Sequence, residues 1–119
     1  MLEKVMRIAI LFDFYGALLT DKQSLSLEMH YLKDFSLAEI ANELGVSRQA
    51  VHDILKRAEQ ILLDYEEKLQ FVARYQREQQ TLQHICNAIH GLPEQIRQLP
   101  ELEMAIQELN SLLDNSKEV

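Results

Sequence analysis

Apolar residues in this chain recur at intervals of three and four positions, and this spacing predicts a protein built from α-helices. One such stretch covers residues 2–19, and a second reaches about residue 34. Two shorter stretches follow, at residues 37–44 and 47–57. No segment alternates apolar and polar residues as a half-buried strand does. We therefore predict an all-α fold.

Capping residues indicate where three of these helices begin. Thr20 precedes Gln23 by three positions. Ser36 precedes Glu39 in the same way. This is the spacing of a capping box, in which two side chains satisfy free backbone amides of the first turn. Ser47 is expected to cap the next helix.

Residues 36–57 have the pattern of a helix-turn-helix, two short helices that cross near a right angle. The small side chain of Ala41 lets the helices approach, and Gly45 supplies the positive φ that the turn needs. Five apolar residues occupy the positions that face the domain core: Ile40, Leu44, Val46, Val51 and Ile54. We therefore predict a helix-turn-helix for this segment.

The second helix of such a motif enters the major groove of DNA with its first turns. Six side chains are expected to point outward there and to form a nucleic-acid contact surface: Arg48, Gln49, His52, Asp53, Lys56 and Arg57. Arg48 is suited to a guanine edge or a phosphate, and Gln49 to an adenine edge. Lys56 and Arg57 are expected to contact backbone phosphates.

The distribution of charge weakens this interpretation. The chain has a net charge of −7, and residues 36–57 carry three basic and three acidic side chains. Residues 58–119 carry five basic and eleven acidic side chains. Strong nucleic-acid binding usually depends on a basic patch. Two interpretations therefore remain open, a weak nucleic-acid contact and a packing motif that presents a protein-binding face.

The helix that Ser47 opens is expected to continue without a stop past residue 70. Its apolar residues follow the heptad spacing of coiled coils. Four of them lie beyond the size of a helix-turn-helix domain: Leu62, Tyr65, Leu69 and Val72. Either a later helix or a second subunit must cover them, because an exposed apolar stripe of that length favours association. We favour the second subunit and predict a homodimer with these four residues in its interface.

The heptad pattern weakens after residue 75 and restarts out of phase at Leu82. It ends near Gly91, and a last short helix is predicted around residues 101–113, with residues 115–119 fraying beyond it. We therefore divide the chain into a helix-turn-helix domain, residues 1–75, and a C-terminal helical extension, residues 76–119. The extension is expected to serve dimerisation or partner binding.

No pattern in the sequence indicates a catalytic, cofactor or metal site. The three glycines stand alone, whereas phosphate-binding loops cluster theirs. Of His84, Cys86 and His90, only the last two share a helix face, and two ligands do not make a zinc site. We therefore expect a protein that is not an enzyme and that has no cofactor and no metal.

The apolar N-terminal stretch is interrupted by Glu3, Arg7 and Asp13, unlike a signal peptide. No stretch approaches the roughly 20 apolar residues that span a bilayer. The single cysteine allows no internal disulfide, as is usual in a reducing compartment. We therefore expect a cytoplasmic protein without membrane insertion.

Two resemblances rest on these motifs. Region 4 of the sigma-70 type transcription factors, whose final helix reads the promoter −35 element, is similar to the run SLAEIANELGVSRQAVHDILKRAE. The bacterial YlxM family is similar over about residues 1–75, with DFY, TDKQ and SRQAV in the same order and spacing. The resemblance implies a fold like sigma region 4 for these residues, to which the predicted C-terminal extension adds a helical arm. It also implies a role, since this family is encoded beside the signal recognition particle GTPase and is proposed to assist or regulate that pathway.

The resemblance to sigma region 4 places Arg48, Gln49, His52 and Asp53 at its base-reading positions. Sigma factors have more arginine there, so His52 and Asp53 depart from the pattern. The resemblance thus implies a regulatory or accessory protein of the signal recognition particle pathway that binds DNA or the particle RNA through residues 47–57. The alternative is an adaptor that contacts the particle's GTPase through its acidic C-terminal arm, without sequence-specific nucleic-acid binding.

Overall fold

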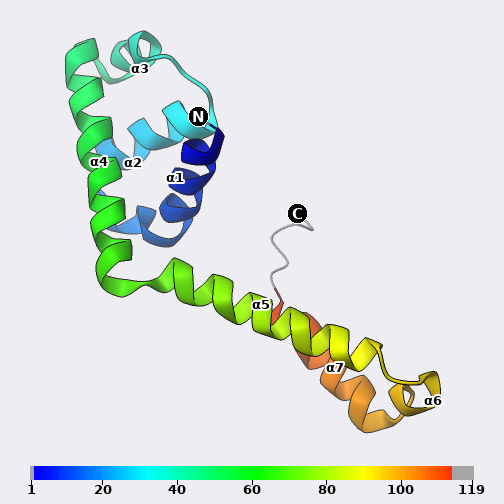
Figure 1. The fold of residues 1–119 in the computed structure, drawn as a ribbon. Coiled ribbons are helices and arrows are strands. Elements are labelled where there is room, and N and C mark those ends of the chain that lie inside the picture. The colour runs from blue at the N-terminus through cyan, green and yellow to red at the C-terminus, as the bar shows by residue number, and fades with distance from the viewer. Residues whose placement is uncertain (1, 114–119) are drawn as a thin grey trace. The chain divides into compact units, whose positions relative to one another are not determined.

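The computed structural model of the protein describes residues 2–113, which are almost entirely helical (Figure 1). The elements are α1 (Leu2–Tyr15), the 3₁₀ turn η1 (Gly16–Leu18), α2 (Asp21–Leu27), the π-helical turn η2 (Glu28–Leu32), α3 (Leu37–Leu44), α4 (Arg48–Leu69), α5 (Phe71–His90), α6 (Glu94–Arg97) and α7 (Pro100–Leu112). No strand occurs between residues 2 and 113, and the predicted all-α fold is confirmed. The tail at residues 115–119, which was expected to fray, lies outside the described residues.

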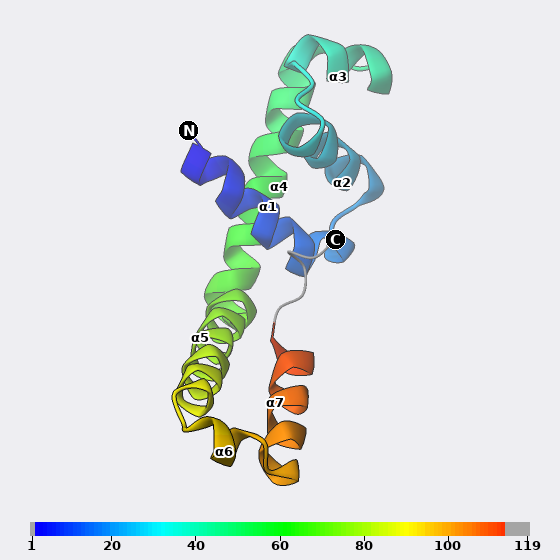
Figure 2. The ribbon, with the colours of Figure 1, turned by 90° about the vertical axis from the view of Figure 1, so that its right-hand side faces the viewer.

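The chain divides into two compact units, Met1–Val72 and Ala73–Val119. In the first unit, α1, α2 and α3 all contact the long helix α4 (Figures 1 and 2). The core of this unit is apolar, and its buried side chains are Ile8, Leu11, Tyr15, Leu27, Met29, Ile40, Ala41, Val51, Leu55, Ala58, Leu62 and Val72. The three- and four-residue spacing along α4 places its apolar residues on the one face that meets the other helices.

The predicted caps of α2 and α3 are present. At α2, the Thr20 hydroxyl accepts from the Gln23 amide at 3.2 Å, and the Gln23 side chain accepts from the Thr20 amide at 3.1 Å. At α3, Ser36 and Glu39 form the same pair of hydrogen bonds, at 3.1 and 2.9 Å. The hydrogen bond from the Ser36 backbone amide lowers the pKa of the Glu39 carboxyl, because it stabilises the charged form.

The first two predicted helices end differently from the expectation. α1 ends at Tyr15 rather than at residue 19, and the chain continues as a 3₁₀ turn. The second helix changes from α to π geometry after Leu27, where the Lys33 amide donates to the Glu28 carbonyl at 3.0 Å. Asp34, with φ of 59°, then ends it. These ends depend on local hydrogen bonds, which the spacing of apolar residues could not predict.

α4 does not continue past residue 70, so the prediction of an unbroken helix is wrong. It ends at Leu69, and Gln70 adopts the left-handed conformation with φ of 58°. The Glu66 carboxylate accepts from the Val72 amide at 3.0 Å and also from the Tyr15 hydroxyl. Tyr15, Glu66 and the amides that follow Gln70 form what we call the Tyr15–Glu66 cluster. It satisfies the free amides that begin α5 and so stabilises the break.

The Tyr15 hydroxyl completes this cluster by accepting from the Phe71 amide at 3.2 Å. Its ring stacks on Tyr65 and on Phe71, with centroids 5.8 and 6.1 Å apart. Burial, and secondarily the hydrogen bond to Glu66, raise the pKa of Tyr15. A tyrosine hydroxyl is already protonated at neutral pH, and the raised pKa keeps Tyr15 a donor to a higher pH than usual.

The four residues predicted for a dimer interface all belong to the first unit, and two of them are buried in its core. Leu62 and Val72 are 0% and 1% exposed. The chain's own helices already cover these two side chains, and an interface between subunits at these positions stays a prediction. Tyr65 is half-buried and stacks on Tyr15, whereas Leu69 is 38% exposed. The heptad spacing therefore reflects packing within the chain at Leu62 and Val72.

In the second unit, α5 and α7 lie side by side as a hairpin, joined through the short helix α6, which the sequence did not predict (Figures 1 and 2). The Gln79 side chain donates to the Leu112 carbonyl at 2.9 Å across the pair. Cys86 is buried, and its thiol lies 3.5 Å from Nδ1 of His90. Across residues 2–113 no cluster of three or more metal-ligating side chains occurs, and no helix is long and apolar enough to cross a membrane.

Candidate nucleic-acid interface

The helix-turn-helix is present at the predicted residues. α3 ends at Leu44, and the next residue, Gly45, has a φ of +67°. The Val46 amide then donates to the Ala41 carbonyl at 3.1 Å. Ser47 caps α4 by accepting from the Ala50 amide at 3.0 Å. The residues of the helix-turn-helix that face the core are buried or half-buried: Ile40, Ala41, Leu44, Val46, Val51 and Ile54. The turn therefore fixes the first turns of α4 relative to α3.

Replacing Gly45 with alanine is expected to lower the free energy of unfolding by about 1 kcal/mol. The space around a Cβ at this position is open, so the cost comes from the left-handed backbone alone. Asparagine tolerates this conformation better, so Gly45→Asn is expected to cost roughly half as much. Urea unfolding followed by circular dichroism measures both, and equal stability of all three proteins would contradict the assignment of Gly45 to this backbone state.

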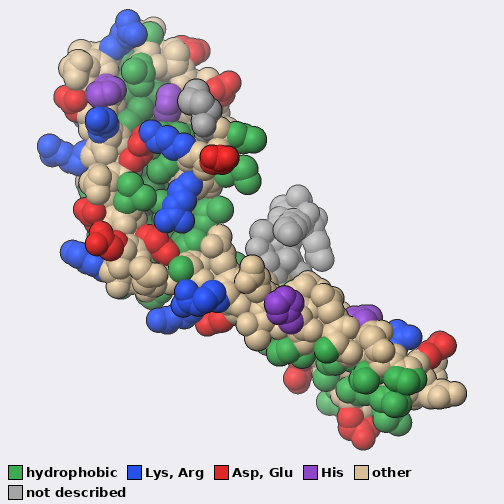
Figure 3. Space-filling view, in the orientation of Figure 1, with side chains coloured by type: hydrophobic (Ala, Val, Ile, Leu, Met, Phe, Trp, Pro, Cys, Tyr) green, Lys and Arg blue, Asp and Glu red, His purple; other side chains and the backbone are tan. Residues whose placement is uncertain are grey.

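All six predicted contact residues are exposed on α4. They share one side of the helix, opposite the buried side chains of Val51, Leu55 and Ala58. The structure thus brings together Arg48, Gln49, His52, Asp53, Lys56 and Arg57 on the outer face of α4. In the view of Figure 3, the basic side chains of the first unit lie among acidic ones and form no continuous patch. This agrees with the balanced charge of the motif.

Asp53 is the centre of a small polar network on this face. Gln49 donates to its carboxylate at 3.1 Å, and Nδ1 of His52 lies 3.6 Å from the same oxygen. This hydrogen bond uses one of the two N–H groups of the Gln49 side-chain amide. Arg48, Lys56 and Arg57 take part in no ion pair among the described residues, and their charges are available to phosphates.

Lys22 is a further cation beside this face, and the sequence did not predict its position there. A shallow groove of about 380 Å³ runs between the start of α2 and α4, lined by Thr20, Lys22, Gln23, Ala50, Asp53, Ile54 and Arg57. It brings the exposed Lys22 to the same groove as Arg57. Lys22 is far from the motif along the chain, and only the packing of α2 on α4 places it there.

Comparisons with known proteins identify relatives over most of the chain. The family profile of UPF0122, described as "Putative helix-turn-helix protein, YlxM / p13 like", matches residues 2–102. A UPF0122 protein of Halalkalibacterium halodurans is 49% identical over 89 residues, which are 75% of this chain and 82% of that protein. One of Symbiobacterium thermophilum is 50% identical over 88 residues, 74% of this chain and 82% of that protein.

A third relative, a UPF0122 protein of Streptococcus gordonii, is 54% identical over 85 residues, 71% of this chain and 77% of that protein. The family match extends beyond residue 75, where the resemblance seen in the sequence ended. The predicted relationship to YlxM is confirmed, and the chain belongs to the UPF0122 family of YlxM-like and p13-like helix-turn-helix proteins.

Proposed function

We propose that the protein is a regulatory or accessory factor of the signal recognition particle pathway that binds DNA or the particle RNA through residues 47–57. The observation that carries the nucleic-acid contact is the outer face of α4, where Arg48, Lys56 and Arg57 are exposed and take part in no ion pair among the described residues. The pathway rests on the resemblance to YlxM. A cytoplasmic location stays a prediction, and we propose no enzyme activity.

Binding by this surface is expected to be weak. Lys22, Arg48, Lys56 and Arg57 are the cations on or beside the face. If each neutralises one phosphate of duplex DNA, the slope of log K against log salt is about −4 at most. Duplex RNA has a major groove too narrow for a helix, so an RNA contact would use loops or the backbone.

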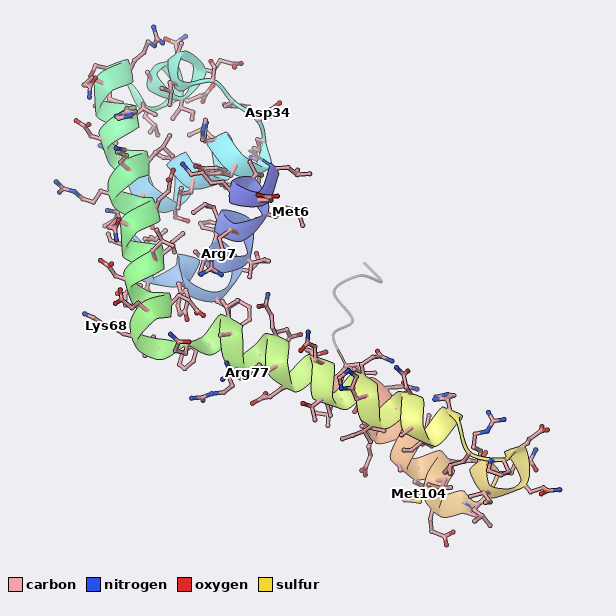
Figure 4. All side chains as sticks on the ribbon, viewed as in Figure 1. Met6, Arg7, Asp34, Lys68, Arg77 and Met104 are labelled. Carbon is pink, nitrogen blue, oxygen red and sulfur yellow. The ribbon has the colours of Figure 1, made fainter. Side chains whose placement is uncertain are left out.

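Replacing both Arg48 and Lys56 with alanine is expected to weaken binding at low salt by roughly 30-fold, since two contacts of about 1 kcal/mol each are lost. Fluorescence anisotropy with a short DNA duplex and with the particle RNA measures this loss. The matched control is Arg7→Ala with Lys68→Ala, which removes the same charge away from the motif (Figure 4). Unchanged binding by the first variant, or equal losses by both, would contradict the proposed surface.

The alternative is an adaptor that binds the basic surface of a protein such as the particle's GTPase. It is favoured by the eleven acidic and five basic side chains of residues 58–119. Glu101, Glu103 and Glu108 are exposed along α7. A pull-down from lysate with and without nuclease separates the two functions. Nuclease releases the bound material if nucleic acid mediates the contact, whereas an adaptor keeps its protein partner.

A further inference from the structure

The second unit has almost no core of its own. We call residues 73–113, with their helices α5, α6 and α7, the C-terminal hairpin. Cys86 is its only buried side chain among the described residues. Six large apolar side chains are exposed on it, with exposed fractions of 36–62%: Ile85, Leu92, Ile96, Leu99, Met104 and Leu112. Figure 3 shows apolar side chains gathered over α6 and α7.

A helical unit of this size needs another surface to be stable. Domains of about 40 residues rarely bury enough apolar area alone, and oligomerisation is one common remedy. Apolar residues in both long helices follow three- and four-residue steps, Leu82, Ile85 and Ile89 in α5 and Leu102, Ile106 and Leu109 in α7. This spacing is typical of helices that pack in bundles. Two such hairpins would supply the four helices of one bundle.

An open groove lies along the first half of α5, beside the end of α7. Its volume is about 730 Å³, and it is lined by Arg74, Arg77, Glu78, Thr81, Leu82 and Leu112. Leu112 is 60% exposed at its edge. Ile85, 44% exposed, follows Thr81 by one turn of α5 and continues the same side of the helix. The groove therefore combines the apolar side chains of Leu82 and Leu112 with two arginines and Glu78.

Charge along the hairpin indicates what covers this surface. Arg74 and Arg77, with Glu78, lie near the start of α5, and the Arg77 side chain extends away from the helix (Figure 4). Three acids lie at the other end, around α6 and the start of α7: Glu94, Glu101 and Glu103. Glu108 is also exposed, farther along α7. Arg97 is also at that end, where its Nε donates to the Leu92 carbonyl at 3.0 Å. No ion pair is formed within residues 73–113.

A second copy in antiparallel orientation would cover the exposed apolar side chains and would bring opposite charges together. A two-fold axis perpendicular to the helices places the arginine end of each hairpin against the acidic end of the other, whereas a parallel pair sets like charges together. We propose that two copies of this chain associate through their C-terminal hairpins as an antiparallel four-helix bundle. This interface is separate from the face of α4, and its test contains no nucleic acid, so it stands or fails independently of the proposed function.

Exchange of charges tests the proposal on the full chain. Sedimentation equilibrium is expected to show a dimer for the unmodified protein. Arg74→Glu with Arg77→Glu is expected to weaken association at least about 100-fold, because two acidic ends then meet. Glu101→Arg with Glu103→Arg is expected to do the same with two basic ends. An equimolar mixture of the two variants, and a chain that carries all four substitutions, are expected to regain the dimer.

All of the replaced side chains are exposed, so the variants are expected to keep their fold, and circular dichroism checks this. A monomeric unmodified protein would overturn the proposal and would leave the surface to the first unit of the same chain or to another protein. A dimer that persists in both charge variants would place the interface elsewhere. A mixture that fails to form the heterodimer would overturn the antiparallel orientation.

Discussion

Replacing Glu66 with alanine is expected to lower the free energy of unfolding of the first unit by about 3 kcal/mol. Glu66 is 5% exposed, and its carboxylate accepts from both the Tyr15 hydroxyl and the Val72 amide. Alanine leaves these two donors without an acceptor. Each buried donor that loses its acceptor costs about 1–3 kcal/mol. The hydrogen bond between α1 and α4 is also lost.

The raised pKa of Tyr15 sets the pH range of this effect. A group whose pKa is higher in the folded state stabilises the fold fully below its unfolded pKa, about 10 for tyrosine. This stabilisation is lost as the pH rises through the folded value. The difference between Glu66→Ala and the unmodified protein is therefore expected at neutral pH and up to about pH 10.

Urea unfolding followed by circular dichroism measures the loss, and two variants control it. Glu66→Gln keeps a carbonyl acceptor but not the charge, so it is expected to cost about half as much as alanine. Glu67→Ala removes the same type of side chain from the exposed neighbouring position and is expected to stay within about 0.5 kcal/mol of the unmodified protein. Equal losses at the two positions would show that the cluster does not stabilise the fold.

The features that the sequence predicted correctly depend on residues close together along the chain. The capping boxes that begin at Thr20 and Ser36 each involve side chains three positions apart. The turn at Gly45 depends on one residue with positive φ. The outward face of α4 follows from helix periodicity, so the exposure of the six candidate side chains could also be predicted.

The features that the sequence missed depend on contacts between distant residues. The break after Leu69 is stabilised by Tyr15, 51 positions before Glu66. Apolar spacing continues across this break, so it predicted one long helix. Lys22 likewise reaches the groove beside Arg57 only through the packing of α2 on α4. The charge and the apolar spacing of a single sequence do not show which distant residues meet in the fold.

Replacing Leu62 with alanine is expected to have the second large effect on stability. The result also tells whether Leu62 is a core residue or an interface residue. Leu62 is fully buried beneath the helices of its own unit. Leu62→Ala removes three buried carbon atoms and leaves a cavity, and such changes cost 2–5 kcal/mol in other proteins. We expect a loss of about 3 kcal/mol in the free energy of unfolding, measured with urea.

Leu63 provides the matched control because it has the same side chain at the next position and is 38% exposed. Leu63→Ala is expected to cost less than about 1 kcal/mol, since little buried area is lost. If Leu62 belongs to the core, its replacement lowers stability at every protein concentration and leaves the association constant of the folded chain unchanged. An interface residue would instead weaken association in sedimentation equilibrium while the stability of the isolated chain stays the same. That second result would restore the heptad of α4 as a contact between subunits and would contradict the burial of Leu62 within one chain.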